Sequence, residues 1–182
     1  LRGISTASEF IRTLDTIIDA TFTEDFWHIT LPENLATSSA RSPSLFAYYA
    51  ALNLLDAKVL FSHMTVSELM DPAIRGRKTS IERHHLFPKA YLLRLGFDGT
   101  RDCNQIANYA LVEWADNIDI RDTPPSAYYA DYANRSSSDE LSELLHWHAL
   151  SENWAEMDYE TFLVDRRKRI AQVVKEGFAK LS

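Results

Sequence analysis

Apolar residues near the start of the chain recur at steps of three and four, which is the spacing of an amphipathic helix. This stripe predicts a helix over residues 8–22 that packs on one face; its members are Phe10, Ile11, Leu14, Ile17 and Ile18. The helical spacing of apolar residues is lost over residues 23–41. There Pro32 and a Thr-Ser-Ser run predict a connecting segment with one extended piece near residues 26–31.

The next helix is predicted to begin at Pro43. The Ser42 hydroxyl can cap free amides, and proline at the first helical position loses no hydrogen bond. Residues 45–55 are apolar nearly all round, which predicts the central buried helix. The sequence Thr65-Val66-Ser67-Glu68 is typical of a capping box and predicts a shorter helix after it.

Two short strands are predicted around one loop in the middle of the chain, the second over residues 109–113. Further helices are predicted over residues 89–95, 125–132, 140–148 and 159–180, the first ended by Gly96 and the last capped by Asp158. The pattern therefore predicts an α+β fold that is mainly helical and forms one domain of residues 1–182.

Composition narrows the class of protein. With 46% apolar and 25% charged residues among 182, the chain is typical of a globular protein, and no apolar run reaches the roughly 18 residues that would span a membrane. Its single cysteine, Cys103, excludes an internal disulfide framework and favours a cytoplasmic location. The net charge of −7 implies that any contact with nucleic acid is local.

The candidate chemistry begins at two adjacent histidines, His84 and His85, which follow a strand-like run and precede Pro88. One imidazole can bind a metal while its neighbour moves a proton. Asn108 and Asn117 follow downstream, one before a strand-like segment and one in a short helix. If strand, loop, strand and helix fold back on one another, the four side chains converge in a ββα-metal arrangement.

These residues resemble those of the HNH (His-Me finger) nucleases. His84-His85-Leu86-Phe87-Pro88 is similar to their Asp/His-His-Ile-x-Pro box, and Asn108-Tyr109-Ala110-Leu111-Val112 is similar to their Asn-Leu-x-x-Leu box. Asn117 falls where they place a closing histidine or asparagine. The match extends toward the C-terminal domain of GmrSD-type modification-dependent restriction endonucleases and related phage-defence proteins, through His84 to Lys89, Asn104 to Asn108, Asn117 to Ile120 and Pro125 to Tyr128.

The resemblance implies metal-assisted hydrolysis of DNA phosphodiesters, by nicking or by cutting. His85 would activate water, Asn108 would orient the loop and the base, and His84 with Asn117 would hold one divalent ion. Mg²⁺ or Mn²⁺ is the expected ion. Because many members have an aspartate at the position of His84, the softer imidazole also admits Co²⁺, Ni²⁺ or Zn²⁺.

The same resemblance implies a division of the domain and a partner. Residues 1–79 would be helical support, residues 80–130 a ββα-metal (HNH) unit embedded in a bundle of helices, and residues 131–182 C-terminal helices. An N-terminal sensor and nucleotide-hydrolysing (NTPase) domain of the same polypeptide is expected upstream, in a bacterial restriction or anti-phage system. This chain has no Gly-rich phosphate loop, so nucleotide hydrolysis is not predicted within it.

Six basic side chains are predicted to contact DNA. Four flank the histidines and two lie in the last helix: Arg75, Arg77, Lys78, Lys89, Arg166 and Arg167. The helical arginines fall between the apolar positions Leu163 and Ile170. At least one guanidinium is therefore expected near the buried apolar face of this helix, where it either pairs with an acid or reaches DNA.

Other functions fit parts of the pattern. Asn104 is interpreted as a helix or turn cap rather than a neighbour of the metal site. The strand unit could be a non-catalytic nucleic-acid-binding or interaction module. Alternatively, His84 and His85 could form a structural zinc site with His146 or His148.

Overall fold

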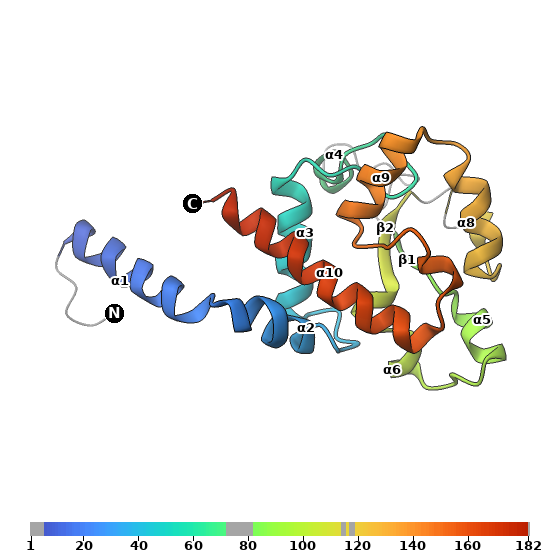
Figure 1. Ribbon diagram of the computed structural model, residues 1–182, viewed down its shortest axis with the longest axis horizontal. Helices are drawn as coiled ribbons and strands as arrows, with labels where there is room; N and C mark the ends of the chain where they lie inside the picture. Colours follow the sequence, from blue (N-terminus) through green and yellow to red (C-terminus); the bar gives the residue numbers. More distant parts are fainter. Residues whose placement is uncertain (1–5, 72–81, 114–115, 117–118, 182) are drawn as a thin grey trace.

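The computed structural model describes residues 6–71, 82–113, 116 and 119–181. Within these ranges the protein is mainly helical with one small antiparallel sheet, as Figure 1 shows. None of the helices in these ranges combines the length and apolar character needed to cross a membrane.

In residues 6–71 the structure has four α-helices and one π-helical turn. They are α1 (Ala7–Thr21), η1 (Phe26–Thr30), α2 (Leu31–Asn34), α3 (Pro43–Leu54) and α4 (Val66–Met70). The capping box predicted at Thr65 is present, with the Thr65 hydroxyl and the Glu68 carboxylate each accepting a hydrogen bond from the other residue's backbone N–H.

The segment near residues 26–31, predicted to be extended, is helical instead. Trp27, Leu31 and Leu35 are spaced by four and are all buried. A helix places this spacing on one face, so burial of the three side chains favours the helical conformation.

The middle of the chain holds the sheet. Strand β1 (Glu82–His85) pairs antiparallel with β2 (Tyr109–Val112), and α5 (Lys89–Arg94), α6 (Thr100–Cys103) and the 3₁₀ turn η2 (Ile106–Asn108) connect them. Gly96 ends the first of these helices in the left-handed conformation, with φ of 92°, as predicted. The described residues Asp116, Asp119 and Ile120, which follow β2, are helical.

The last part returns to helices. They are α8 (Pro125–Ala133), α9 (Ser138–Trp147), the 3₁₀ turn η3 (Trp154–Glu156) and the long α10 (Tyr159–Ala179). Ser137 caps α9, and Asp158 caps α10 as the sequence predicted.

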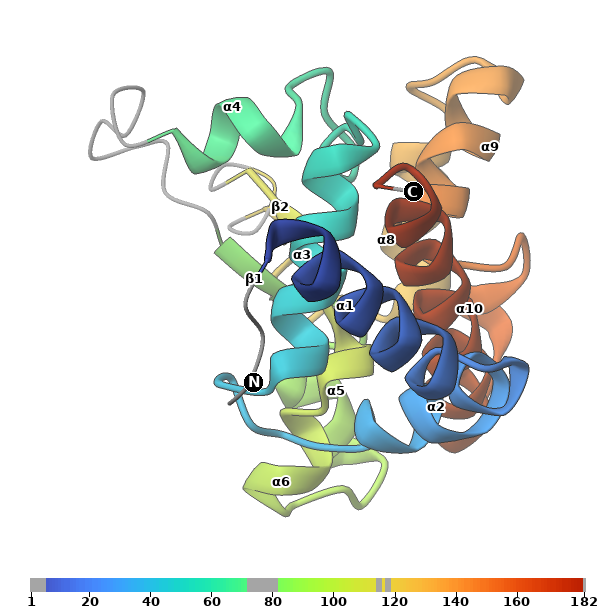
Figure 2. The ribbon, with the colours of Figure 1, turned by 90° about the vertical axis from the view of Figure 1, so that its left-hand side faces the viewer.

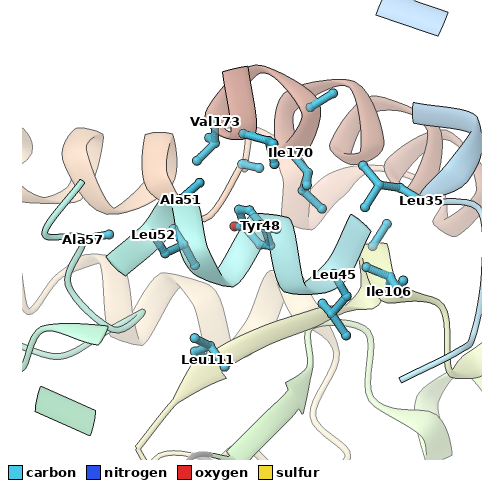
Figure 3. Close-up of a cluster of buried hydrophobic side chains, with 14 of the residues drawn as sticks. Leu35, Leu45, Tyr48, Ala51, Leu52, Ala57, Ile106, Leu111, Ile170 and Val173 are labelled. Carbon is cyan, nitrogen blue, oxygen red and sulfur yellow. The ribbon is translucent and has the colours of Figure 1, made fainter. Parts of the chain in front are cut away.

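The packing is organised around α3 and α10. Figure 3 shows α3 between α10 on one side and β2 on the other, with Tyr48 and Ala51 toward Ile170 and Val173, and Leu45 toward Ile106. The predicted burial of α3 is confirmed on these faces, whereas Phe46 and Leu54 are exposed. A second cluster of buried side chains lies around Phe87, Trp154 and Phe162, beneath the loop that follows the histidines.

Helix α1 differs from the others because none of its residues is buried. It extends away from the helices around α3 and α10 in Figure 1, and it lies in front of them in the view of Figure 2. The predicted amphipathic helix is therefore confirmed, but its packing on one face is not observed among the residues that the structure describes.

Candidate active site

The two histidines lie at the end of β1. His84 pairs with Ala110 and His85 with Tyr109 across the sheet. Consecutive side chains of a strand point to opposite faces, and the two rings accordingly have different neighbours. The His85 ring contacts the ring of Tyr109 at 4.7 Å between centroids, whereas buried His84 lies edge to face with Tyr128 at 5.9 Å.

The orientation of His85 is set by Asn104. The His85 Nε2 and the Asn104 Oδ1 are 2.9 Å apart. Because a carboxamide oxygen can only accept a hydrogen bond, Nε2 donates its proton to it, and the ring's lone pair lies on Nδ1. The ring is therefore held in one tautomer.

The environment of His85 also favours its neutral form. Burial lowers the pKa of His85 below the usual 6.5, the bond to Asn104 raises it in part, and the positive charge of Lys89 lowers it further. A neutral imidazole with a basic Nδ1 can accept a proton at neutral pH.

Asn108 fixes the loop after the histidines. It is fully buried; its Oδ1 accepts from the Phe87 N–H at 2.8 Å, and its Nδ2 donates to the carbonyls of Phe87 and Cys103, both at 3.0 Å. The Leu86 N–H also donates to the Asn108 carbonyl at 2.9 Å. With these bonds made, the side chain of Asn108 holds the loop after the histidines in place.

Tyr128 ties the same loop to α8. Its hydroxyl donates to the Leu86 carbonyl at 2.7 Å while its ring faces His84. Burial raises the pKa of Tyr128 well above 10, so the hydroxyl remains a donor. One side chain therefore supports both the loop and the first histidine.

The predicted metal ligands are His84 and Asn117. Asn117 lies outside the described residues, as do the predicted DNA contacts Arg75, Arg77 and Lys78. Among the described residues no group of three or more His, Cys, Asp or Glu side chains gathers as a potential metal site. An imidazole and a carboxamide are neutral ligands that suit a divalent ion retaining several waters.

The other predicted DNA contacts are placed differently from one another. Lys89 is exposed, and its charge acts on His85. Arg167 is half-buried in a groove of about 260 Å³ that His28 and Lys168 also line.

Arg166 lies inside the protein, with 1% of its surface exposed. Its Nε donates to the His148 carbonyl at 3.1 Å and its Nη1 to the Ala107 carbonyl at 2.8 Å. The expected buried guanidinium is thus Arg166. These two hydrogen-bond partners are backbone carbonyls rather than an acid or a phosphate, because α10 packs directly against the turn before β2.

The prediction overlooked two residues beside His85. Asn104, interpreted as a cap, uses its side chain to orient the ring. Arg83 is exposed, and its guanidinium lies over the Tyr109 ring at 5.8 Å from the centroid. The alternation of a strand places Arg83 and His85 on one face, so the sequence contained a signal for Arg83.

The remaining histidines have partners of their own. His146 Nε2 lies 2.9 Å from Glu176 Oε2, and His148 Nε2 lies 2.9 Å from the Lys58 carbonyl. His148 is fully buried, and burial lowers its pKa to about 4. These contacts do not favour a zinc site shared with His84 and His85.

The class of protein that the structure defines is a mainly helical α+β protein with a two-stranded antiparallel sheet. Comparisons with protein-family models, curated proteins and solved structures find no match. A functional assignment therefore rests on the motifs and on the geometry around His85.

Proposed function

We propose that this chain is a metal-dependent endonuclease that hydrolyses DNA phosphodiesters, with His85 as the general base. The observation that carries the proposal is the bond between His85 Nε2 and Asn104 Oδ1, which leaves the lone pair on Nδ1 of a neutral ring. The order of β1, β2 and the helical residues that follow supports a ββα-metal unit of the HNH kind.

In the proposed reaction, His85 Nδ1 accepts a proton from a water molecule as that water attacks phosphorus. The ring then carries a positive charge, and the Asn104 oxygen continues to accept from Nε2–H and stabilises it. Asn108 and Tyr128 keep the adjoining loop in place. A divalent ion, Mg²⁺ or Mn²⁺, held by His84 and Asn117 would supply stabilisation of the charge that develops on the leaving oxygen.

Substrate contact would be local. The exposed cations Arg83 and Lys89 lie near His85, in a chain whose net charge is −7. A few cations on an acidic domain give weak, salt-sensitive binding to DNA. This supports a nuclease that a linked N-terminal sensor and NTPase domain would bring to its substrate, in the cytoplasm of a bacterium that restricts foreign DNA.

A plasmid-nicking assay with Mg²⁺ or Mn²⁺ tests the proposal. His85→Ala is expected to reduce nicking by roughly 100-fold or more, because it removes the base. His146→Ala, which alters an exposed histidine of α9, serves as the matched control and is expected to retain parental nicking. Equal nicking by the parent and His85→Ala would remove His85 from the mechanism, and DNA binding without nicking by the parent would favour a binding module.

His84→Ala tests whether the two histidines have different roles, one in metal binding and one in proton transfer. It is expected to raise the metal concentration required for half-maximal nicking, whereas His85→Ala should leave metal affinity near that of the parent. Isothermal titration with Mn²⁺ measures this affinity directly. Because His84 is buried, circular dichroism of the variant must first match that of the parent.

A further inference from the structure

The turn over residues 59–62, between α3 and α4, has an aromatic residue at a position that favours glycine. The Ser62 N–H donates to the Val59 carbonyl at 3.0 Å, and of the two central residues only Phe61 has a positive φ, of 65°. Turns with a positive φ at the third residue favour glycine or asparagine there, because a bulky side chain is strained in the left-handed region. Such strain persists only where the surrounding structure holds it, and it clusters at functional sites.

The 59–62 turn is fastened to β2. The Leu60 N–H donates to the Leu111 carbonyl at 3.1 Å, and the Ser62 hydroxyl donates to the Glu113 carboxylate. Leu111 lies one residue from the position that pairs with His84 across the sheet. The backbone of the turn is therefore fixed relative to the strand beside His84.

The ring of Phe61 packs against two tyrosines of α8. It stacks on Tyr132 at 4.4 Å between centroids and meets Tyr128 edge to face at 6.5 Å. The two tyrosine rings are also edge to face, at 6.3 Å, and Tyr128 is edge to face with His84 at 5.9 Å. Aromatic pairs favour these relative orientations, so a continuous row of ring contacts links Phe61 to His84.

We propose that Phe61 is a positioning residue that holds the His84 ring, through Tyr128, in the orientation that binds the divalent ion. The strained backbone directs the Phe61 ring onto the two tyrosines, whereas glycine would relieve the strain and leave Tyr128 without this support. Replacing a group that orients a metal ligand commonly weakens metal affinity by about 10- to 100-fold. The inference rests on the proposed function, in which His84 is a metal ligand.

Isothermal titration with Mn²⁺ tests the effect on metal affinity. Phe61→Gly removes the ring and fits the positive φ without strain, and it is expected to raise the Kd by about tenfold. Asp56→Gly is the matched control, because Asp56 also has a positive φ, of 53°, but is exposed and belongs to no ring contact. Its Kd should equal that of the parent. Equal Kd values for Phe61→Gly and the parent would overturn the inference.

The plasmid-nicking assay distinguishes positioning from a general loss of structure. At saturating Mn²⁺, Phe61→Gly should recover the parental kcat, because only occupancy by the ion is impaired, whereas His85→Ala should not recover. A kcat that stays low in Phe61→Gly at saturation would give Phe61 a purely structural role. If Phe61→Gly does not fold, Phe61→Leu, which keeps an apolar side chain but loses the ring, is tested in its place with the same expectations.

A double-mutant cycle tests whether the effect passes through Tyr128. Phe61→Leu is expected to raise the Kd for Mn²⁺ in the parent but to change it no further in Tyr128→Leu, because the linking ring is then already absent. An equal fold-change in both backgrounds would overturn the proposed route.

A measurement without metal separates this inference from the nuclease proposal. Nuclear Overhauser effects between the ring protons of Tyr128 and His84 are expected in the parent and in Asp56→Gly, and they should weaken in Phe61→Gly. Equal effects in the two variants would overturn the positioning role even if the parent nicks DNA. A parent that neither binds Mn²⁺ nor nicks DNA would overturn the nuclease proposal and, with it, the role of Phe61 in metal binding.

Discussion

At the scale of single residues, the most informative side chain is Asn104. Its Oδ1 determines which nitrogen of His85 carries the proton. Because this oxygen carries no hydrogen and can only accept, the proton lies on Nε2 of the ring. The ring's basicity therefore depends on a residue 19 positions away, which would act on the substrate only through His85.

Substitutions of Asn104 should distinguish a role in orienting the His85 ring from a role in maintaining the fold. Asn104→Ala is expected to lower kcat for nicking by roughly tenfold, with KM for DNA near the parental value, because the ring loses its fixed tautomer. Asn104→Asp keeps the acceptor and adds a negative charge that stabilises the protonated ring, which raises the pKa of His85.

The pH profile provides the decisive measurement. If His85 is the base, the lowered pKa of its ring is expected to place the acid limb of kcat/KM below pH 6.5 in the parent, because activity would fall as the ring becomes protonated. In Asn104→Asp this limb should move to higher pH, with activity recovering in alkaline buffer. Gln105→Ala, at the next residue, should leave the limb where it is; an unmoved limb in Asn104→Asp would assign Asn104 a purely structural role.

At the scale of elements, α3 and α10 form the packing unit that supports the sheet. The two helices pack tightly at Gly177, where an added Cβ would lie 2.6 Å from the Ala51 Cβ and 2.8 Å from its Cα. Near the other end of α10, Arg166 joins the helix to the turn before β2 through the Ala107 carbonyl. Helix packing thus positions Asn108, which follows Ala107.

Gly177→Ala is expected to destabilise the protein even though alanine favours a helix by about 1 kcal/mol. The new methyl group would contact the backbone of α3, which cannot rotate away, so we expect a net loss of about 1–3 kcal/mol in the free energy of unfolding. Urea denaturation measures it. Gln172→Ala, at an exposed position of the same helix, should change stability little, and a stabilised Gly177→Ala would show that the helices separate readily.

At the scale of the whole molecule, His148 links stability to pH. The ring is fully buried, and burial lowers its pKa to about 4 against an ordinary value of 6.5. Between these values the unfolded chain binds a proton that the folded protein excludes. Stability from this group is therefore complete above pH 6.5 and decreases as the pH falls toward 4.

We expect His148 to account for a loss of about 2 kcal/mol in the free energy of unfolding between pH 7 and pH 5. His148→Gln retains a donor for the Lys58 carbonyl but does not titrate. The variant should therefore lose less free energy of unfolding between pH 7 and pH 5 than the parent, by about 2 kcal/mol. Urea titrations of parent and variant at both pH values give the difference. Equal losses would show that protons reach His148 in the folded state.

Much of the secondary structure could be predicted because its signals are local. The Thr65 capping box, the Ser137 and Asp158 caps and the glycine that ends α5 each act within a few residues of themselves. Such contacts form whatever surrounds them. Cys103 is also buried, because a lone cysteine commonly behaves as a small apolar side chain.

The candidate site was predictable only in part. The sequence by itself identified the paired histidines after a strand-like run and the asparagine before the second strand. Tertiary structure decided that Asn104 orients His85, that Arg166 is buried, that residues 26–34 are helical and that α1 has no cover within the described chain. These outcomes depend on contacts between residues distant in sequence, which no local pattern encodes, because packing and not propensity selects which polar groups meet and which apolar faces are buried.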